Sequence, residues 1–286
     1  MIRRSWSRAR LGIASLAILT LAPAQRLIAQ VCRPPSSSNE AKTFAIVSVP
    51  LAFGPALAPE ARPQFQVGLE GTYLPKVDRA TATPTTCQPG KGPEDTDFLF
   101  AVPRPRIGLP LPLGLALQAS WIPPVRLAGV KANLFGVSVA KSFGLGSLVG
   151  SLRAHGTFGS IRAAITCGRA ALADPVSECF NGTLSDDKLS PNIIGADLAL
   201  GRTMIGGRLR PYVGGGYSRL EPRFRVNFTN QFGGVDRTRV EVHLNRAVFF
   251  GGATWRLAEH FTATTEVYAA PADAVTVRLA VRAVRP

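Results

Sequence analysis

Several segments of about ten residues alternate apolar and polar side chains, and no other feature of the chain limits its fold as much. One face of residues 64–73 is apolar and the other is mostly polar or glycine; the apolar members are Phe65, Val67, Leu69 and Tyr73. The same pattern recurs in residues 148–158, 192–202, 261–269 and 275–284. Alternation with a period of two indicates β-strands, because successive side chains of a strand point to opposite faces.

Five further segments have a noisier pattern, and with the first five they predict ten strands. These are residues 98–106, 113–121, 130–141, 209–220 and 242–256. Every second connection between the ten segments is short, and the others include all the long, polar ones. This parity is typical of an antiparallel up-and-down transmembrane β-barrel. The predicted fold class is therefore all-β with about ten strands, although eight or twelve would also satisfy the parity.

The composition favours a barrel that faces lipid. Hydrophobic residues make up 46% of the 286 residues, charged residues make up 18%, and the mean hydropathy is +0.14. After residue 30, no apolar run reaches the roughly twenty residues that a spanning helix needs. The alternative is a soluble extracytoplasmic binding barrel of the lipocalin-like kind, which turns apolar side chains inward and charges outward.

Residues 1–30 have the order of a secretory signal peptide. Four arginines without any acid precede the apolar run 11–22, and small residues follow it. Residues 31–63 differ from the barrel region 64–286. The spacing of Ser37 and Glu40 predicts a helix over 37–48, and several prolines after it keep the chain extended. We therefore expect export, then a short N-terminal segment, then a barrel.

Residues 64–286 resemble a small bacterial outer-membrane β-barrel protein. The resemblance rests on alternating segments such as Phe65-Gln66-Val67-Gly68-Leu69-Glu70, on the parity of the connections and on the signal peptide. It implies residence in the bacterial outer membrane, insertion by the barrel-assembly machinery, and contact with outer-membrane lipid and lipopolysaccharide. No motif in the chain points to a cofactor.

Export makes the four cysteines candidates for disulfides. Cys167 and Cys179 are twelve residues apart in a polar stretch, so we expect them to close a local loop. Cys32 and Cys87 then remain for each other, although Cys87 lies in the first long loop, on the outer side. Their bond requires residues 31–63 to start at the outer end and descend through the lumen as a plug. The alternative is two unpaired or intermolecular cysteines. Zinc is not expected, because no histidine lies near a cysteine.

The polar faces of the strands carry charges that we expect in the lumen: Glu70, Arg153, Asp197, Arg246, Glu266, Arg278 and Arg282. Paired across a narrow interior they would be structural, whereas an excess of basic groups would favour anions in a small pore. The net charge of +15 does not indicate nucleic-acid binding, because the arginines are scattered without interleaved aromatics. Four rim arginines are expected either to touch lipid phosphates or lipopolysaccharide or to be solvated: Arg223, Arg225, Arg237 and Arg239.

The sequence does not predict an enzyme. Among the three histidines, His243 has the best surroundings, because Glu241 stands two residues before it on the same face and could orient a base. No serine nucleophile can be assigned to this pair, so a membrane enzyme acting at the rim is kept as an alternative. The predicted function is a structural barrel or a passive, anion-leaning pore for small solutes, open or plugged.

Overall fold

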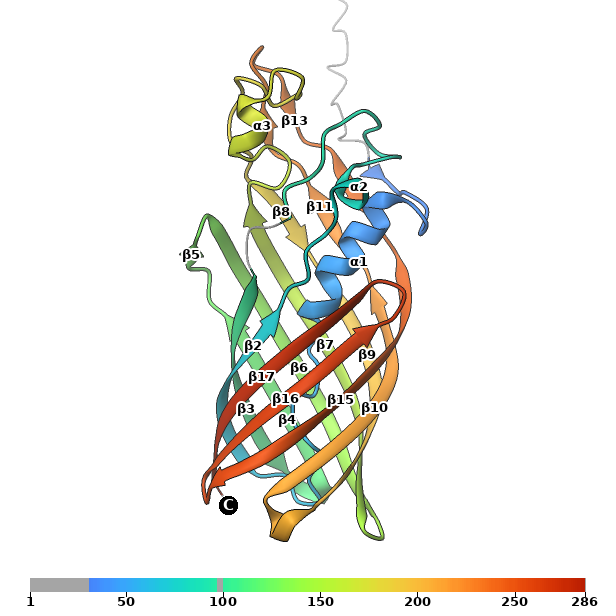
Figure 1. Ribbon diagram of the computed structural model, residues 1–286, viewed down its shortest axis with the longest axis vertical. Coiled ribbons are helices and arrows are strands. Elements are labelled where there is room, and N and C mark those ends of the chain that lie inside the picture. The colour runs from blue at the N-terminus through green and yellow to red at the C-terminus, as the bar shows by residue number, and fades with distance from the viewer. Residues whose placement is uncertain (1–30, 97–99, 286) are drawn as a thin grey trace, which may run out of the picture.

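Ten long strands form a closed antiparallel barrel in the computed structural model, which describes residues 31–96 and 100–285 (Figure 1). Each strand pairs with the next one along the barrel, and β17 closes it against β2. The barrel strands are β2 (Phe65–Tyr73), β3 (Ala101–Leu111), β4 (Leu115–Ile122), β6 (Val130–Leu145), β7 (Leu148–Ala163), β9 (Ile193–Arg202), β10 (Leu209–Leu220), β15 (Leu244–Ala258), β16 (Phe261–Ala270) and β17 (Ala274–Arg285). The predicted fold class is confirmed, while the predicted signal peptide lies outside the described residues.

β3, the strand that contains Pro103, Pro105 and Pro110, begins and ends later than predicted. β3 begins at Ala101 and ends at Leu111, whereas the sequence pattern predicted 98–106. Pro103 and Pro105 lie in the part of β3 that pairs only with β2, because the pairing with β4 starts at Arg106. A strand with a single neighbour tolerates proline, since the missing N–H groups are not needed for a second ladder.

Short turns lie at one end of the barrel and the long connections lie at the other, which we call the outer end. The short turns are η1 (Pro112–Gly114), residues 146–147, residues 203–208 with η2 (Ile205–Gly207), and residues 259–260. At the outer end the wall is extended by β8 (Asp187–Ser190), β11 (Arg223–Arg225) and β14 (Arg239–Glu241), which pair in that order. The smaller elements there are α2 (Arg79–Ala82), β5 (Arg126–Leu127), α3 (Arg169–Ala173), β12 (Phe228–Thr229) and β13 (Val235–Asp236).

The outer surface of the barrel is apolar. Large apolar side chains are exposed at alternate positions along the barrel strands, for example Leu69 at 57% and Leu279 at 61%. Toward the outer end, three exposed aromatic residues stand opposite one another across β4, β6 and β7; we call Trp121, Phe135 and Phe158 the aromatic row. A continuous apolar exterior with aromatic residues near its edge suits lipid and is unfavourable in water. The exterior is therefore that of a membrane-spanning barrel rather than of a soluble lipocalin-like one.

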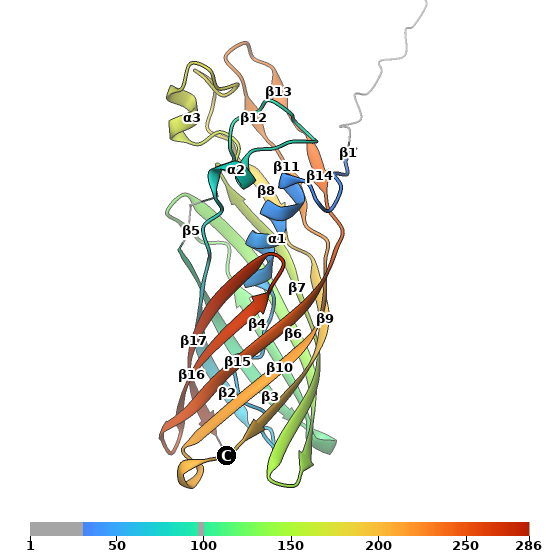
Figure 2. The ribbon, with the colours of Figure 1, turned by 45° about the vertical axis from the view of Figure 1, so that its right-hand side comes forward.

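The N-terminal segment enters the barrel from the outer end. β1 (Val31–Cys32) pairs with β14, and α1 (Asn39–Leu51) then descends inside the barrel (Figure 2). Ser38 rather than Ser37 caps the helix, because its hydroxyl accepts a hydrogen bond from the N–H of Ala41. The helix thus begins two residues later than predicted. Within the described ranges, no helix has both the length and the hydropathy to cross a membrane.

Two disulfides hold the connections at the outer end. Cys32 is bonded to Cys87 and Cys167 to Cys179, at sequence separations of 55 and 12. These are the two pairings that the sequence argument arrives at. Since Cys32 lies at the outer end and β2 starts at the opposite end, the chain between them runs through the barrel. We call residues 39–63 the plug.

Candidate functional site

The occupied lumen is the candidate functional site, and its centre is a group of buried arginines around the lower end of α1. Arg104 and Arg106 lie on β3, Arg153 lies on β7 and Arg278 lies on β17. We call these four residues the arginine ring. Each of them donates hydrogen bonds to main-chain carbonyl oxygens of the plug.

The arginine ring donates hydrogen bonds to six consecutive carbonyls, those of residues 50–55, where α1 ends and the extended part of the plug begins. The distances are 3.5 Å from Arg278 Nη2 to Pro50 O, 2.9 Å from Arg104 Nη2 to Leu51 O, 3.0 Å from Arg278 Nη2 to Ala52 O, 2.6 Å from Arg153 Nη1 to Phe53 O, 2.9 Å from Arg106 Nη2 to Gly54 O, and 3.2 Å from Arg106 Nη1 to Pro55 O. The last carbonyls of a helix lack helical partners and carry the negative end of its dipole. The arginine ring supplies both the missing donors and the complementary charge.

Three acids of the barrel wall pair with members of the arginine ring and compensate part of its charge. Glu70 Oε2 lies 2.5 Å from Arg106 Nη2, and Asp197 accepts two hydrogen bonds from Arg153, at 3.1 Å and 2.5 Å. The third acid, Glu266, lies 3.1 Å from Arg278 Nη1. All three carboxylates are buried. Because an unpaired buried charge is costly, these pairs are what permits the arginines to sit in the interior.

Glu266 also holds the plug directly. Its Oε2 accepts a hydrogen bond from the N–H of Ala56 at 2.9 Å and another from the hydroxyl of Tyr212 at 2.8 Å. Two residues further along the plug, the N–H of Ala58 donates to the hydroxyl of Thr254 at 3.1 Å. The wall therefore binds both the carbonyls and the N–H groups of the plug.

Two of the lumen charges expected from the sequence lie away from these contacts. Arg282 is buried on β17, and neither of its Nη atoms has a hydrogen-bond partner among the described residues. Arg246 stands two residues from the outer end of β15 and pairs with Asp273 in the β16–β17 turn. It stands on the inward-facing side of the strand, at the outer rim of the lumen rather than beside the plug contacts described above.

Sequence reasoning missed Arg104 and Arg106. Prolines at 103 and 105 marked the segment as an irregular strand, and its alternation was not followed further. The order Pro-Arg-Pro-Arg is itself alternating, with the arginines buried and the prolines on the outside. That spacing was the signal that could have found them.

Phe53 fits the plug to the wall. Its side chain is fully buried, and the guanidinium carbon of Arg106 lies 4.1 Å from the centre of its ring. On β6, Gly136 leaves room for this ring, because a Cβ at that position would stand 2.8 Å from Phe53 Cδ2. Glycine is therefore required here by the close approach of the plug.

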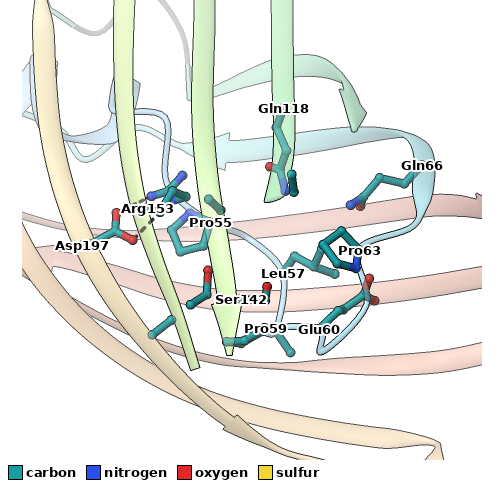
Figure 3. Close-up of a pocket in the computed structure, with 15 residues that line it drawn as sticks. Pro55, Leu57, Pro59, Glu60, Pro63, Gln66, Gln118, Ser142, Arg153 and Asp197 are labelled. Atoms are coloured by element: carbon teal, nitrogen blue, oxygen red, sulfur yellow. Dashed lines mark hydrogen bonds and ion pairs between the residues drawn. The ribbon is translucent and has the colours of Figure 1, made fainter. Parts of the chain in front are cut away.

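Below the arginine ring, the plug leaves a small pocket of about 50 Å³ (Figure 3). Arg153 and Asp197 border it on one side, and Gln66 and Gln118 from the wall also line it. The plug side is formed by its proline-rich part, residues 55–63. At this end Glu60 anchors the plug by an ion pair with Arg210, at 2.7 Å.

Glu40 fixes the upper end of the plug to the first long connection. Its Oε1 accepts hydrogen bonds from three consecutive N–H groups, those of Thr85 at 3.0 Å, Thr86 at 2.7 Å and Cys87 at 2.8 Å. Burial alone would raise the pKa of Glu40, but the N–H donors of Cys87 and Thr86 outweigh it and hold the pKa below 4.5. The ionised carboxylate thus reinforces the Cys32–Cys87 bond.

The histidines do not form the arrangement considered for catalysis. Glu241 lies 3.4 Å from Arg33, and His243 Nδ1 lies 3.6 Å from Glu221, so the Glu241–His243 pair considered as an alternative does not form. In the lumen, His155 Nε2 lies 3.4 Å from Asp197 Oδ2.

Neither ring nitrogen of His155 nor the hydroxyl of the nearby Ser218 has a hydrogen-bond partner among the described residues. A Cβ at Gly195 would stand 2.7 Å from His155 Nε2 and 2.8 Å from Ser218 Oγ. A catalytic triad needs one imidazole nitrogen bonded to the acid and the other bonded to the nucleophile, and His155 does not have this arrangement. In the described ranges, no group of three or more His, Cys, Asp or Glu residues could hold a metal ion.

Comparison with known proteins does not identify a family for this chain. No protein-family model matches the sequence, and no curated protein matches it. Three solved structures illustrate what the chain is similar to. They are the N-terminal β-barrel domain of Pseudomonas aeruginosa OprF (11% identity, TM-score 0.29, covering 78% of this chain and 100% of that one), the P. putida toluene transporter TodX (12%, 0.32, 85% and 70%) and the Acinetobacter baumannii outer membrane protein Omp33 (10%, 0.29, 79% and 99%). Because the sequence identities and TM-scores are this low, the function is argued from the residues of this chain.

Proposed function

We propose that this chain is a bacterial outer-membrane barrel whose lumen is closed by its own plug, and that it passes small anions passively once the plug is displaced. The observation that carries the proposal is the double role of the arginine ring, which holds the plug and lines the path that the plug would vacate. Export through residues 1–30, insertion by the barrel-assembly machinery and residence in the outer membrane belong to the same proposal. The apolar exterior supports the last of these.

The Cys32–Cys87 bond keeps the plug in the lumen. Above the helix, the chain is bonded to the first long connection, and below the plug it continues directly into β2. A segment held at both ends of a closed barrel cannot leave it. Breaking the bond leaves the upper end held only by non-covalent contacts, among them those of β1 with β14 and of Glu40 with residues 85–87, so it can be withdrawn toward the end where β2 begins.

The charge of the emptied wall supports a preference for anions. On the ten barrel strands, five buried arginines, Arg104, Arg106, Arg153, Arg278 and Arg282, face three buried acids, Glu70, Asp197 and Glu266. The difference, five minus three, leaves two positive charges in excess along a narrow path. An excess of one sign in a low-dielectric channel concentrates ions of the other sign.

Conductance across a planar bilayer tests the proposal. The full chain, a Cys32→Ser/Cys87→Ser variant and a matched Cys167→Ser/Cys179→Ser variant would be compared, with folding of each verified by heat-modifiable migration on gels. We expect the first and third to be silent and the second to open intermittently. In a KCl gradient the reversal potential should indicate chloride as the preferred ion.

Two results would overturn parts of the proposal. A folded Cys32→Ser/Cys87→Ser variant that stays silent at every voltage would show a purely structural barrel. A reversal potential that indicates potassium would contradict the anion preference while leaving the displaceable plug intact.

A further inference from the structure

The wall at the outer end presents a row of basic side chains to the outside. Lys188, Arg225 and Arg239 stand directly opposite one another across β8, β11 and β14, and all three are exposed. We call them the outer basic row. Arg162 of β7 is next in line, opposite Lys188. The three strands lie side by side above the barrel proper, where Figure 2 labels all of them.

The outer basic row does not serve the fold. Like charges opposite one another destabilise a sheet, and none of the three has an ion pair with an acid in the part of the chain that the structure describes. The nearby acids are bound elsewhere: Asp186 to Arg162 at 2.7 Å, Glu221 to Arg219 at 2.5 Å, and Glu241 to Arg33 at 3.4 Å. The row is thus a repulsive arrangement that only an external anion would relieve.

The backbone beneath the row is held in place by the plug. Leu189, Phe224 and Val240, on the opposite face of the same three strands, are buried. The ring of Phe224 lies 5.4 Å, centre to centre, from that of Phe44 on α1. The three cationic side chains are therefore carried on a rigid wall, and little ordering is needed when they bind a ligand.

The height of the row indicates what kind of ligand it meets. Arg162 lies four residues beyond Phe158 on β7, which is about 13 Å along the strand and about 10 Å in height at the usual tilt. Arg225 lies eight residues beyond the exposed Tyr217, about 26 Å along β10 and β11. The polar layer of a bilayer is only about 5–8 Å thick on each side. A phospholipid headgroup therefore reaches no further than the level of Arg162, and only a taller anionic headgroup extends along the outer basic row.

We propose that the outer basic row binds the phosphate groups of lipopolysaccharide, whose phosphorylated sugars rise from the outer leaflet. Phosphate accepts charge-assisted hydrogen bonds from arginine and lysine, and several phosphates in line match several cations in line. Of the four rim arginines expected to touch lipid, Arg225 and Arg239 belong to the row. Arg223 stands opposite Glu241, and Arg237 precedes β14.

Native mass spectrometry of lipopolysaccharide adducts on the detergent-folded full chain tests this site. The test variant is Lys188→Gln/Arg225→Gln/Arg239→Gln. The matched control is Arg202→Gln/Arg208→Gln/Arg256→Gln, three exposed arginines at the opposite end of the barrel. We expect the test variant to bind lipopolysaccharide at least about tenfold more weakly, and the control to bind like the unmodified chain. Heat-modifiable migration shows that each variant is folded.

Competitors identify the source of the phosphate. Phosphatidylglycerol and inorganic phosphate, added at the same phosphate concentration, should displace little lipopolysaccharide. The inference is overturned if the test variant retains the affinity of the control, or if either small competitor displaces the adduct. It is also overturned if a soluble sulfated polysaccharide binds the row more tightly than lipopolysaccharide does. None of these measurements depends on conduction, so a failure of the pore proposal would not overturn the inference of lipopolysaccharide binding.

Discussion

Replacing Glu266 by Gln tests whether buried charge pairs hold the plug. Glu266 is 1% exposed and makes three contacts: with Arg278 at 3.1 Å, with the N–H of Ala56 at 2.9 Å and with the hydroxyl of Tyr212 at 2.8 Å. Glutamine has the same shape but only one acceptor oxygen. In either orientation its NH₂ group faces a donor, Arg278 on one side or the Ala56 N–H on the other.

The expected loss follows from the geometry of the site. Removing one partner of a buried ion pair costs about 3–5 kcal/mol, because the other charge is left uncompensated. Arg278 keeps two carbonyl acceptors of the plug and the ring of Tyr268, whose centre lies 4.0 Å from its guanidinium carbon. The loss should therefore lie at the lower end, about 3 kcal/mol in the free energy of unfolding. Adding Arg278→Met removes the orphaned charge, so the double variant should be more stable than the sum of the two single losses by about 2 kcal/mol.

Equilibrium unfolding in urea, with the protein inserted in phospholipid vesicles and followed by tryptophan fluorescence, measures these differences. Glu241→Gln is the control, because among the described residues the side chain of Glu241 pairs only with the exposed Arg33, at 3.4 Å. The free energy of unfolding of this variant should change by less than about 0.5 kcal/mol. The reasoning is refuted if Glu266→Gln costs no more than the control, or if the double variant is strictly additive.

Two further predictions concern the outer end. Cys167→Ser/Cys179→Ser opens a loop with a sequence separation of 12 and removes about 3 kcal/mol of loop-closure stabilisation. We expect rapid proteolysis within residues 168–178 while the barrel stays folded. Slow proteolysis would mean that α3 and its neighbours hold the loop without the disulfide. The second follows from the lowered pKa of Glu40: a depressed pKa stabilises the folded state above 4.5 and loses that contribution as the pH falls through the folded-state value. Hydrogen exchange at the amides of Thr85, Thr86 and Cys87 should therefore accelerate in acid beyond its intrinsic pH dependence, and Glu40→Gln should abolish that extra pH dependence; an unchanged profile in the variant would contradict this.

The barrel could be predicted because its signal is local and repeated. Residues 209–220 were predicted as a strand and form β10 with the same bounds, although they contain three consecutive glycines, of which Gly215 stands on the outward, apolar face. A lipid-facing strand needs only that alternate positions be apolar, and glycine satisfies that requirement on either face. The path of the plug through the lumen could also be predicted, because a bond to Cys87 in an outer loop requires Cys32 to lie at the outer end.

The partners of the arginines could not be predicted, for a physical reason. From the sequence, Asp197 and Glu266 were expected among the lumen charges, and in the structure they pair with Arg153 and Arg278. The other acceptors are main-chain carbonyls of residues 50–55, and every residue carries such a group. No residue type marks them, so neither the helix end nor its position in the barrel could be derived from side chains. The cap at Ser38 instead of Ser37 has a similar origin, since both serines can serve.

The contacts of the arginine ring connect the closed state to the proposed anion preference. Each guanidinium in the ring faces a carbonyl oxygen, which bears partial negative charge and accepts hydrogen bonds as an anion does. When the plug leaves, six carbonyl acceptors are withdrawn and the acids of the wall remain, so the lumen loses negative partial charge while its positive charge is unchanged. An entering anion supplies the acceptors that the plug removed. The plug and a permeating anion therefore compete for the same donors, and the residues that close the barrel are those that would select the ion when it opens.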